Sequence, residues 1–79
     1  MSHWNYRVVR SGRGENICYS IHEVYYNSRG GITMLSEAPI HAFGSVIEEL
    51  REDLKTMNVA FEKPTLIMED IQFEAPDTI

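Results

Sequence analysis

The sequence has a single cysteine and no long apolar run, and these two absences exclude several classes of protein. Cys18 has no second cysteine within the chain to pair with, so an intramolecular disulfide is excluded and a reducing, cytoplasmic compartment is the simpler expectation. No segment approaches the roughly 18 consecutive apolar residues of a membrane span, and the N-terminus lacks the apolar core of a signal peptide. We therefore predict a cytoplasmic protein with no membrane partner.

Basic residues are also few. The chain holds 7 Lys and Arg against 12 Asp and Glu, which gives a formal net charge of −5, and an acidic chain is a poor general binder of nucleic acid. The charge is unevenly distributed: residues 1–31 hold four arginines and two glutamates (+2), whereas residues 32–79 hold three basic and ten acidic groups (−7). The second part of the chain therefore suits a small basic protein partner.

The short length predicts one domain and a need for additional stabilisation. With 79 residues the chain cannot fill two hydrophobic cores, so we expect a single domain over residues 1–68 and a flexible acidic tail over residues 69–79. Domains of this size commonly add a disulfide, a metal or a second subunit. Because a disulfide is excluded and the histidines show no metal-ligand spacing, we expect a homodimer.

The clearest pattern lies between Gly44 and Pro64 and predicts one amphipathic helix. Ser45 and Glu48 have the spacing of a capping box at a helix start, and Pro64 disfavours helical geometry in the residue before it. Apolar residues recur three and four positions apart and fall on one stripe: Ile47, Leu50, Leu54, Met57 and Phe61. We expect this stripe to be buried.

Three strands are expected before the helix and a short one after it. Residues 4–10, 17–26 and 32–37 have strand patterns separated by glycine-containing turns, and residues 65–68 form either a fourth strand or an arm that pairs with another subunit. The expected fold class is α+β, with a three- to four-stranded antiparallel sheet (β-β-β-α-β) and one amphipathic helix packed on it. The strand residues expected to meet the helix are Tyr6, Val8, Tyr19 and Ile21.

Few residues have the chemistry of a catalytic or cofactor site. Cys18 and His22 lie on the same side of a regular strand, where a thiol and a base can approach one another. The pair lacks an orienting third group and an oxyanion donor, and a lone cysteine more commonly acts as a small apolar residue. We therefore expect no enzymatic activity, no cofactor and no metal site.

The candidate interaction residues lie in the helix and directly after it. Four carboxylates gather at the front of the helix, where they also stabilise the positive end of the helix dipole: Glu48, Glu49, Glu52 and Asp53. They form either a solvated helix face or a docking surface for a basic partner. The apolar run after the helix adds Leu66, Ile67 and Met68.

An alternative function uses the N-terminal hairpins. Arginines alternate there with aromatic residues that can stack on bases: Arg7, Arg10, Arg13, Arg29, Trp4, Tyr25 and Tyr26. This combination suits a nucleic-acid-binding accessory protein, although long basic side chains also decorate strand edges in proteins that bind no nucleic acid.

Three strands followed by Gly44-Ser45-Val46-Ile47-Glu48-Glu49-Leu50 at a helix start resemble the HicB-like antitoxin domain over about residues 4–68. In that family a meander leads through a proline-containing connector into a Gly-x-(Ser/Thr)-x-Glu-Glu helix start, and a short strand follows. The usual Pro-Asp-Leu-Pro-Gly-Cys connector is replaced here, and the sequence shows no ribbon-helix-helix or helix-turn-helix segment. The resemblance implies a protein-interaction module that neutralises a toxin without binding operator DNA. The chain is also similar to small bacterial proteins that share the strand of residues 21–26 and the helix of residues 49–54, which implies no particular activity.

Overall fold

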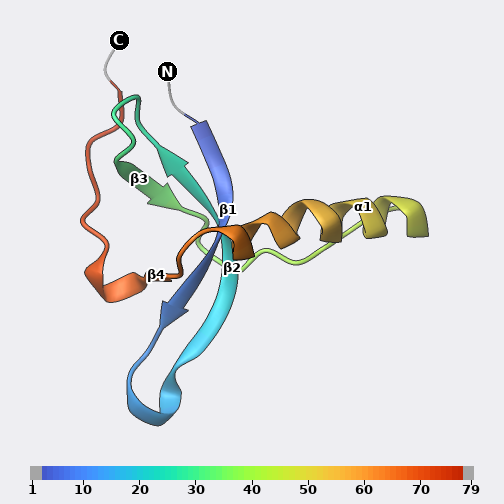
Figure 1. Cartoon of the computed structure of the whole chain (residues 1–79), viewed down its shortest axis with the longest axis horizontal. Coiled ribbons are helices and arrows are strands. Elements are labelled where there is room, and N and C mark those ends of the chain that lie inside the picture. The colour runs from blue at the N-terminus through green and yellow to red at the C-terminus, as the bar shows by residue number, and fades with distance from the viewer. Residues whose placement is uncertain (1–2, 78–79) are drawn as a thin grey trace.

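A computed structural model describes residues 3–77, which form a four-stranded sheet and one α-helix (Figure 1). The strands are β1 (His3–Ser11), β2 (Cys18–Tyr26), β3 (Ile32–Leu35) and β4 (Leu66–Ile67). Helix α1 (Ile47–Met57) continues into a 3-10 turn (Asn58–Glu62), and shorter 3-10 turns span Gly14–Asn16 and Met68–Asp70. The predicted α+β class and element order are confirmed. Within the described residues, no helix has the length and apolar character needed to cross a lipid bilayer.

The sheet is mixed, because β4 pairs in parallel with β1. The strand order is β3-β2-β1-β4, and β2 runs antiparallel to both β1 and β3. Leu66 and Ile67 of β4 lie beside Val9 and Arg10 in parallel register. The chain crosses from one edge of the sheet to the other through α1, which allows β4 to run in the direction of β1. The prediction of an antiparallel sheet is therefore wrong for the fourth strand, which pairs within its own chain.

The strand pattern left open which sheet face is buried, and the most deeply buried strand residues lie on the face opposite to Tyr6, Val8, Tyr19 and Ile21. Residues paired across β1 and β2 share a face, and Val9, Val24 and Tyr26 are on one face with exposed fractions of 0%, 0% and 7%. On the other face Val8 is buried, but Tyr19 is 64% exposed. Val8 and Val9 are both apolar and adjacent, so alternation along β1 does not distinguish the two faces.

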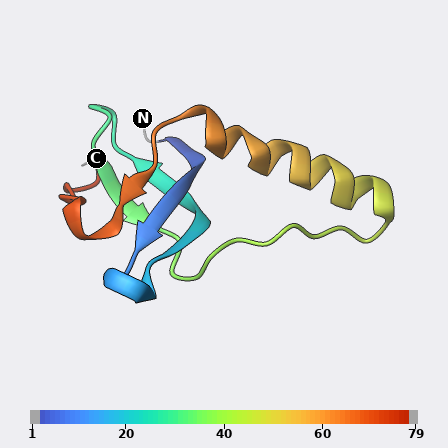
Figure 2. The same ribbon diagram turned by 60° about the horizontal axis from the view of Figure 1, so that its bottom comes forward.

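Helix α1 does not pack across the sheet but projects away from it (Figure 2). Met57, at its end, is its only buried residue. Ile47 and Leu54 of the predicted stripe are 64% and 55% exposed, and Phe61 in the following turn is 67% exposed. The extended connector over residues 36–46 runs beside α1 (Figure 2). The predicted burial of the stripe is therefore wrong for these three residues.

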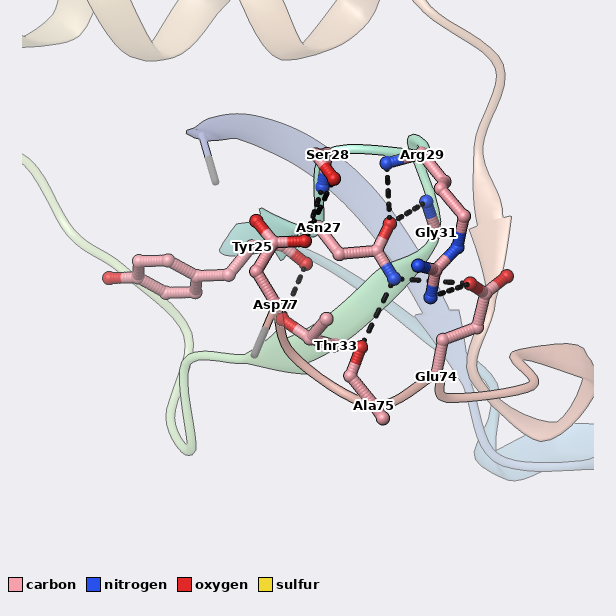
Figure 3. A network of polar contacts seen from close by, with 9 residues as sticks. All are labelled: Tyr25, Asn27, Ser28, Arg29, Gly31, Thr33, Glu74, Ala75 and Asp77. Carbon is pink, nitrogen blue, oxygen red and sulfur yellow. Dashed lines mark hydrogen bonds and ion pairs between the residues drawn. The ribbon is translucent and has the colours of Figure 1, made fainter. Parts of the chain in front are cut away.

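The C-terminal segment joins the two edges of the sheet (Figure 3). After β4 the chain returns to the β3 edge, where the backbone N–H of Glu74 donates to the carbonyl of Ile32 at 2.8 Å. The amide nitrogen of Asn27, a fully buried residue, donates to the Glu74 carboxylate and to the carbonyl of Ala75, both at 3.1 Å. These bonds give the segment specific partners, and its predicted flexibility stays a prediction. Residues 78–79 of the predicted tail and residues 1–2 lie outside the described part of the chain.

The contact between Asp77 and Ser28 makes the docking of this segment dependent on pH. Asp77 Oδ1 accepts hydrogen bonds from the backbone N–H and the hydroxyl of Ser28, both at 2.9 Å. These two bonds hold the pKa of Asp77 below its ordinary value. The contribution of Asp77 to stability is therefore complete above the unfolded-state pKa of about 3.9, and it is lost as the pH falls through the lower folded-state pKa.

We expect the amide NMR signal of Ser28 to titrate with a midpoint below about 3.9. The titration should be absent in Asp77→Asn and unchanged in Asp70→Asn, which alters a carboxylate elsewhere in the segment. A midpoint at or above the unfolded value would contradict the contact.

Candidate interaction site

The four acidic residues predicted from the sequence line one open groove between α1 and the connector. The groove has a volume of about 400 Å³, and its lining is Phe43, Glu48, Glu49, Glu52, Asp53 and Thr56. Phe43, on the connector, is 71% exposed and gives the groove its aromatic part. Phe43 and Thr56 were not predicted from the sequence as part of this site. Helical spacing would have placed Thr56 one turn after Glu52, but no local pattern indicates that the connector brings Phe43 back to the helix.

Two of the carboxylates hold the connector against α1. Asp53 accepts a hydrogen bond from the backbone N–H of Phe43 at 2.9 Å, and Glu49 accepts one from the backbone N–H of Ser45 at 2.8 Å. Each bond satisfies a backbone donor of an extended segment that has no strand partner there. These two hydrogen bonds between the connector and α1 therefore close the groove on the side of the connector.

Gly44 permits the close approach of the connector to the helix. A Cβ added at this position would lie 2.5 Å from the backbone nitrogen of Leu50, a distance that real Cβ atoms do not adopt. The glycine between the two hydrogen-bonded residues thus lets the connector pass the helix backbone without a side chain in between.

The predicted capping box is not formed, and the helix begins one residue later than predicted. The residue that precedes the first helical turn is Val46, and no side chain caps the helix there. The carboxylate of Glu49, rather than that of Glu48, returns to the backbone N–H of Ser45. Glu48 is thereby left for other contacts.

Glu48 and Glu52 are the carboxylates of the groove that do not hold the connector. Within residues 3–77, the carboxylate of Glu48 makes no hydrogen bond and no ion pair. Glu52 lies 3.6 Å from the ammonium of Lys55, but their side chains are 71% and 74% exposed, so solvent screens this pair. Both carboxylates remain accessible to a partner.

The negative charge of this region also acts on the sheet. The pKa of Tyr6 on β1 is raised above its ordinary value, chiefly by burial and further by the charges of Asp53 and Glu23.

The groove is not built as a metal centre. Among residues 3–77, no three His, Cys, Asp or Glu side chains are arranged to hold a metal ion. Four carboxylates beside an exposed phenyl ring instead form an anionic surface with an apolar component, which complements side chains that combine a cation with an aliphatic stem.

The other predicted interaction residues lie elsewhere. Leu66 and Ile67 of β4 line a separate open pocket of about 410 Å³, together with Ile32 of β3 and residues of the C-terminal segment. Met68 begins the 3-10 turn that follows β4. The structure therefore divides the predicted interaction residues between two surfaces.

Cys18 and His22 are each engaged with other side chains. Cys18 is exposed, and its Sγ lies 3.5 Å from the hydroxyl of Ser11, which contradicts the expectation of a buried apolar role. His22 is 5% exposed. Its Nε2 lies 3.0 Å from the hydroxyl of Ser20 and its Nδ1 lies 3.0 Å from the carbonyl oxygen of Ser36.

Two of the arginines from the N-terminal hairpins take part in contacts within the chain. Arg7 donates to the hydroxyl of Tyr26 at 3.0 Å. Arg29 lies 3.8 Å from the carboxylate of Glu74 in the C-terminal segment. These guanidinium groups thus stabilise the fold at two different places.

Comparisons with models of protein families, with curated proteins and with solved structures found no match. The resemblance to the HicB-like domain therefore stays a prediction.

Proposed function

We propose that this protein is a non-enzymatic interaction module that binds a small basic protein in the groove between α1 and the connector. The observation that carries this proposal is the groove itself, in which four carboxylates surround an exposed Phe43. Glu48 and Glu52 are not needed to hold the chain, so their charges are available to a partner. The net charge of −7 over residues 32–79 attracts a basic partner at longer range.

The groove suits a lysine- or arginine-bearing protein segment better than a small ligand. It is open, and its charges are spread along α1 over two turns, from Glu48 to Asp53. A basic side chain placed there pairs its cation with a carboxylate while its stem, or a guanidinium plane, packs on Phe43. An extended or helical basic segment can repeat this contact along the helix.

The element order β-β-β-α-β is the order that the HicB-like resemblance implies, and it supports the same class of function. In this proposal the protein acts in the cytoplasm of a bacterium, and the basic partner is a small toxin that the module neutralises. Binding occludes the partner's surface and requires no chemical step.

The proposal is tested by capturing partners from native cell extract on the tagged full-length chain and on the double variant Glu48→Gln/Glu52→Gln. We expect the wild-type chain to retain a small basic protein that is released by about 1 M salt, where the screening length falls to about 3 Å. The double variant should retain less than a tenth as much. The matched control is Glu15→Gln/Glu62→Gln, which makes the same change in net charge at exposed carboxylates outside the groove.

Retention of the same protein by the wild type and both variants would show that the partner binds elsewhere, and recovery of nothing but copies of this chain would overturn the proposal. For the antitoxin form, the captured protein expressed alone should slow growth, and co-expression of this chain should restore it. A captured partner without effect on growth would reject the antitoxin form and leave the interaction module in place.

A further inference from the structure

Two apolar surfaces of the chain are uncovered. The first, which we name the α1 stripe, consists of Ile47, Leu50 and Leu54, and its two outer members are 64% and 55% exposed. The second, which we name the open sheet face, consists of residues that the strand register places on one side of the sheet: Trp4, Tyr19, Tyr25 and Met34. Trp4, Tyr19 and Met34 are 48%, 64% and 53% exposed.

Aromatic side chains at one end of the open sheet face are already in contact with one another. The ring of Trp4 meets that of Tyr6 edge to face with centroids 5.2 Å apart, and it lies 6.3 Å from the ring of Tyr25. Tyr6 lies on the same side of the sheet as Trp4 and Tyr25, so these three rings form one aromatic cluster at this end of the open sheet face, whereas Tyr19 lies nearer its other end, beyond the buried Val8.

The solvent-accessible area of the chain exceeds the area expected for a compact monomer of this mass, and the excess is about the area that one partner buries in a standard protein–protein interface. The accessible surface is 5974 Å², whereas a folded monomer of 9.1 kDa exposes about 4,900 Å². The excess of roughly 1,100 Å² is larger than the about 800 Å² that each partner buries in a standard protein–protein interface. The radius of gyration, 13.9 Å, likewise exceeds the about 11.6 Å expected for this length.

The α1 stripe does not lie on the open sheet face of its own chain, because the connector and the helix are joined and project together from the sheet (Figure 2). Phe43 and Ser45 bind the helix through Asp53 and Glu49, and Gly44 lies directly against the helix backbone. The helix and the connector therefore lie side by side and form one arm that projects from the sheet (Figure 2). In this arrangement the rest of the same chain does not cover the stripe, and a second molecule can cover it without any change in the chain.

We propose that this other molecule is a second copy of the chain, and that the two copies exchange their arms. The α1 stripe of each copy lies on the open sheet face of the other. The two copies are then related by a two-fold axis, and both apolar surfaces of each copy are covered. No apolar surface is left to bind a third copy, so the assembly is closed.

The exchange leaves the acidic groove free. On a helix of 3.6 residues per turn, Glu48, Glu52 and Thr56 fall on the side opposite to the stripe. The dimer and the binding of a basic partner therefore use different sides of α1, and one can fail without the other.

The first test is the molar mass of the full chain by light scattering and sedimentation. We expect a dimer of twice 9.1 kDa for the wild type and a single-chain mass for Leu54→Asp. The matched control, Thr56→Asp, introduces the same charge two residues away on the opposite side of α1 and should stay dimeric. A dimer is also expected for Glu48→Gln/Glu52→Gln, which separates this test from that of the proposed function.

The second test determines which surfaces meet. Two chains, both carrying Cys18→Ser, are mixed, one with Leu54→Cys and the other with Met34→Cys, and are then oxidised. Arm exchange predicts a disulfide-linked heterodimer, and at least tenfold less product when Thr56→Cys replaces Leu54→Cys.

A wild-type chain that stays monomeric at high micromolar concentration would overturn the proposal, as would a dimer that Leu54→Asp does not dissociate. A monomer in which the Leu54→Cys thiol is protected from labelling would show that the helix folds back on its own sheet, and it would overturn the proposal as well. A dimer without the Leu54–Met34 link would place the interface elsewhere.

Discussion

Met57→Ala is expected to destabilise the fold by about 2 to 5 kcal/mol, as other buried methionine truncations do. Met57 is 5% exposed and is the one residue through which α1 itself enters the core. Its side chain is buried at the base of the arm, so its removal leaves a cavity there. Denaturant unfolding measured by circular dichroism gives the change in free energy.

The matched control is Met34→Ala, because Met34 is a methionine that is 53% exposed. Both variants are compared at protein concentrations where the midpoint no longer depends on concentration, which removes any contribution from association. Under these conditions Met34→Ala should cost less than about 1 kcal/mol. Equal costs for the two substitutions would show that Met57 does not anchor the arm.

The second large effect is expected at Asn27, whose substitution by alanine should cost about 2 kcal/mol or more. Asn27 is fully buried, and its carbonyl oxygen accepts from the backbone N–H groups of Arg29 (3.0 Å) and Gly31 (2.9 Å). Its amide nitrogen donates to Glu74 and Ala75. All of its polar capacity is used (Figure 3), and alanine would leave several partners without a hydrogen bond.

The contributions of the two ends of this amide can be separated. Asn27→Asp keeps acceptors for the turn between β2 and β3, but it loses both donors and places a negative charge beside Glu74. We expect hydrogen exchange to show that the C-terminal segment detaches while the turn stays protected. The control Asn16→Ala, at an exposed position, should have little effect. Detachment of the turn together with the segment would show that the two are not independent.

If arm exchange and partner binding both hold, the dimer presents two acidic grooves. A partner with two basic segments would then gain from the second contact, provided that its segments span the distance between the arms. Such a partner should bind the wild-type dimer more tightly than it binds the monomeric Leu54→Asp chain, because the variant offers only one groove.

The sequence predicted the elements of this protein well where local physics decides. Alternation and β-branched residues placed β1 and β2 to within one residue at each end. The 3.6-residue period placed α1, and the turn glycines were found where the backbone needs them: Gly12 has φ of +89° and Gly30 has φ of +86°. The four carboxylates were predicted as one cluster because they follow one another along a helix.

The tertiary structure alone decided how these elements meet. A period identifies the apolar side of a helix, but whether that side lies on its own sheet depends on the connector. Here Gly44 and the bonds to Asp53 and Glu49 join the connector to the helix, and the two project together from the sheet. The parallel pairing of β4 and the site at Phe43 likewise depend on contacts between residues far apart in the chain, which no local pattern records. The sequence thus determined the secondary structure and the charge of this protein, because these follow from neighbouring residues. Its inner sheet face, its projecting helix and its groove follow only from long-range packing and hydrogen bonds.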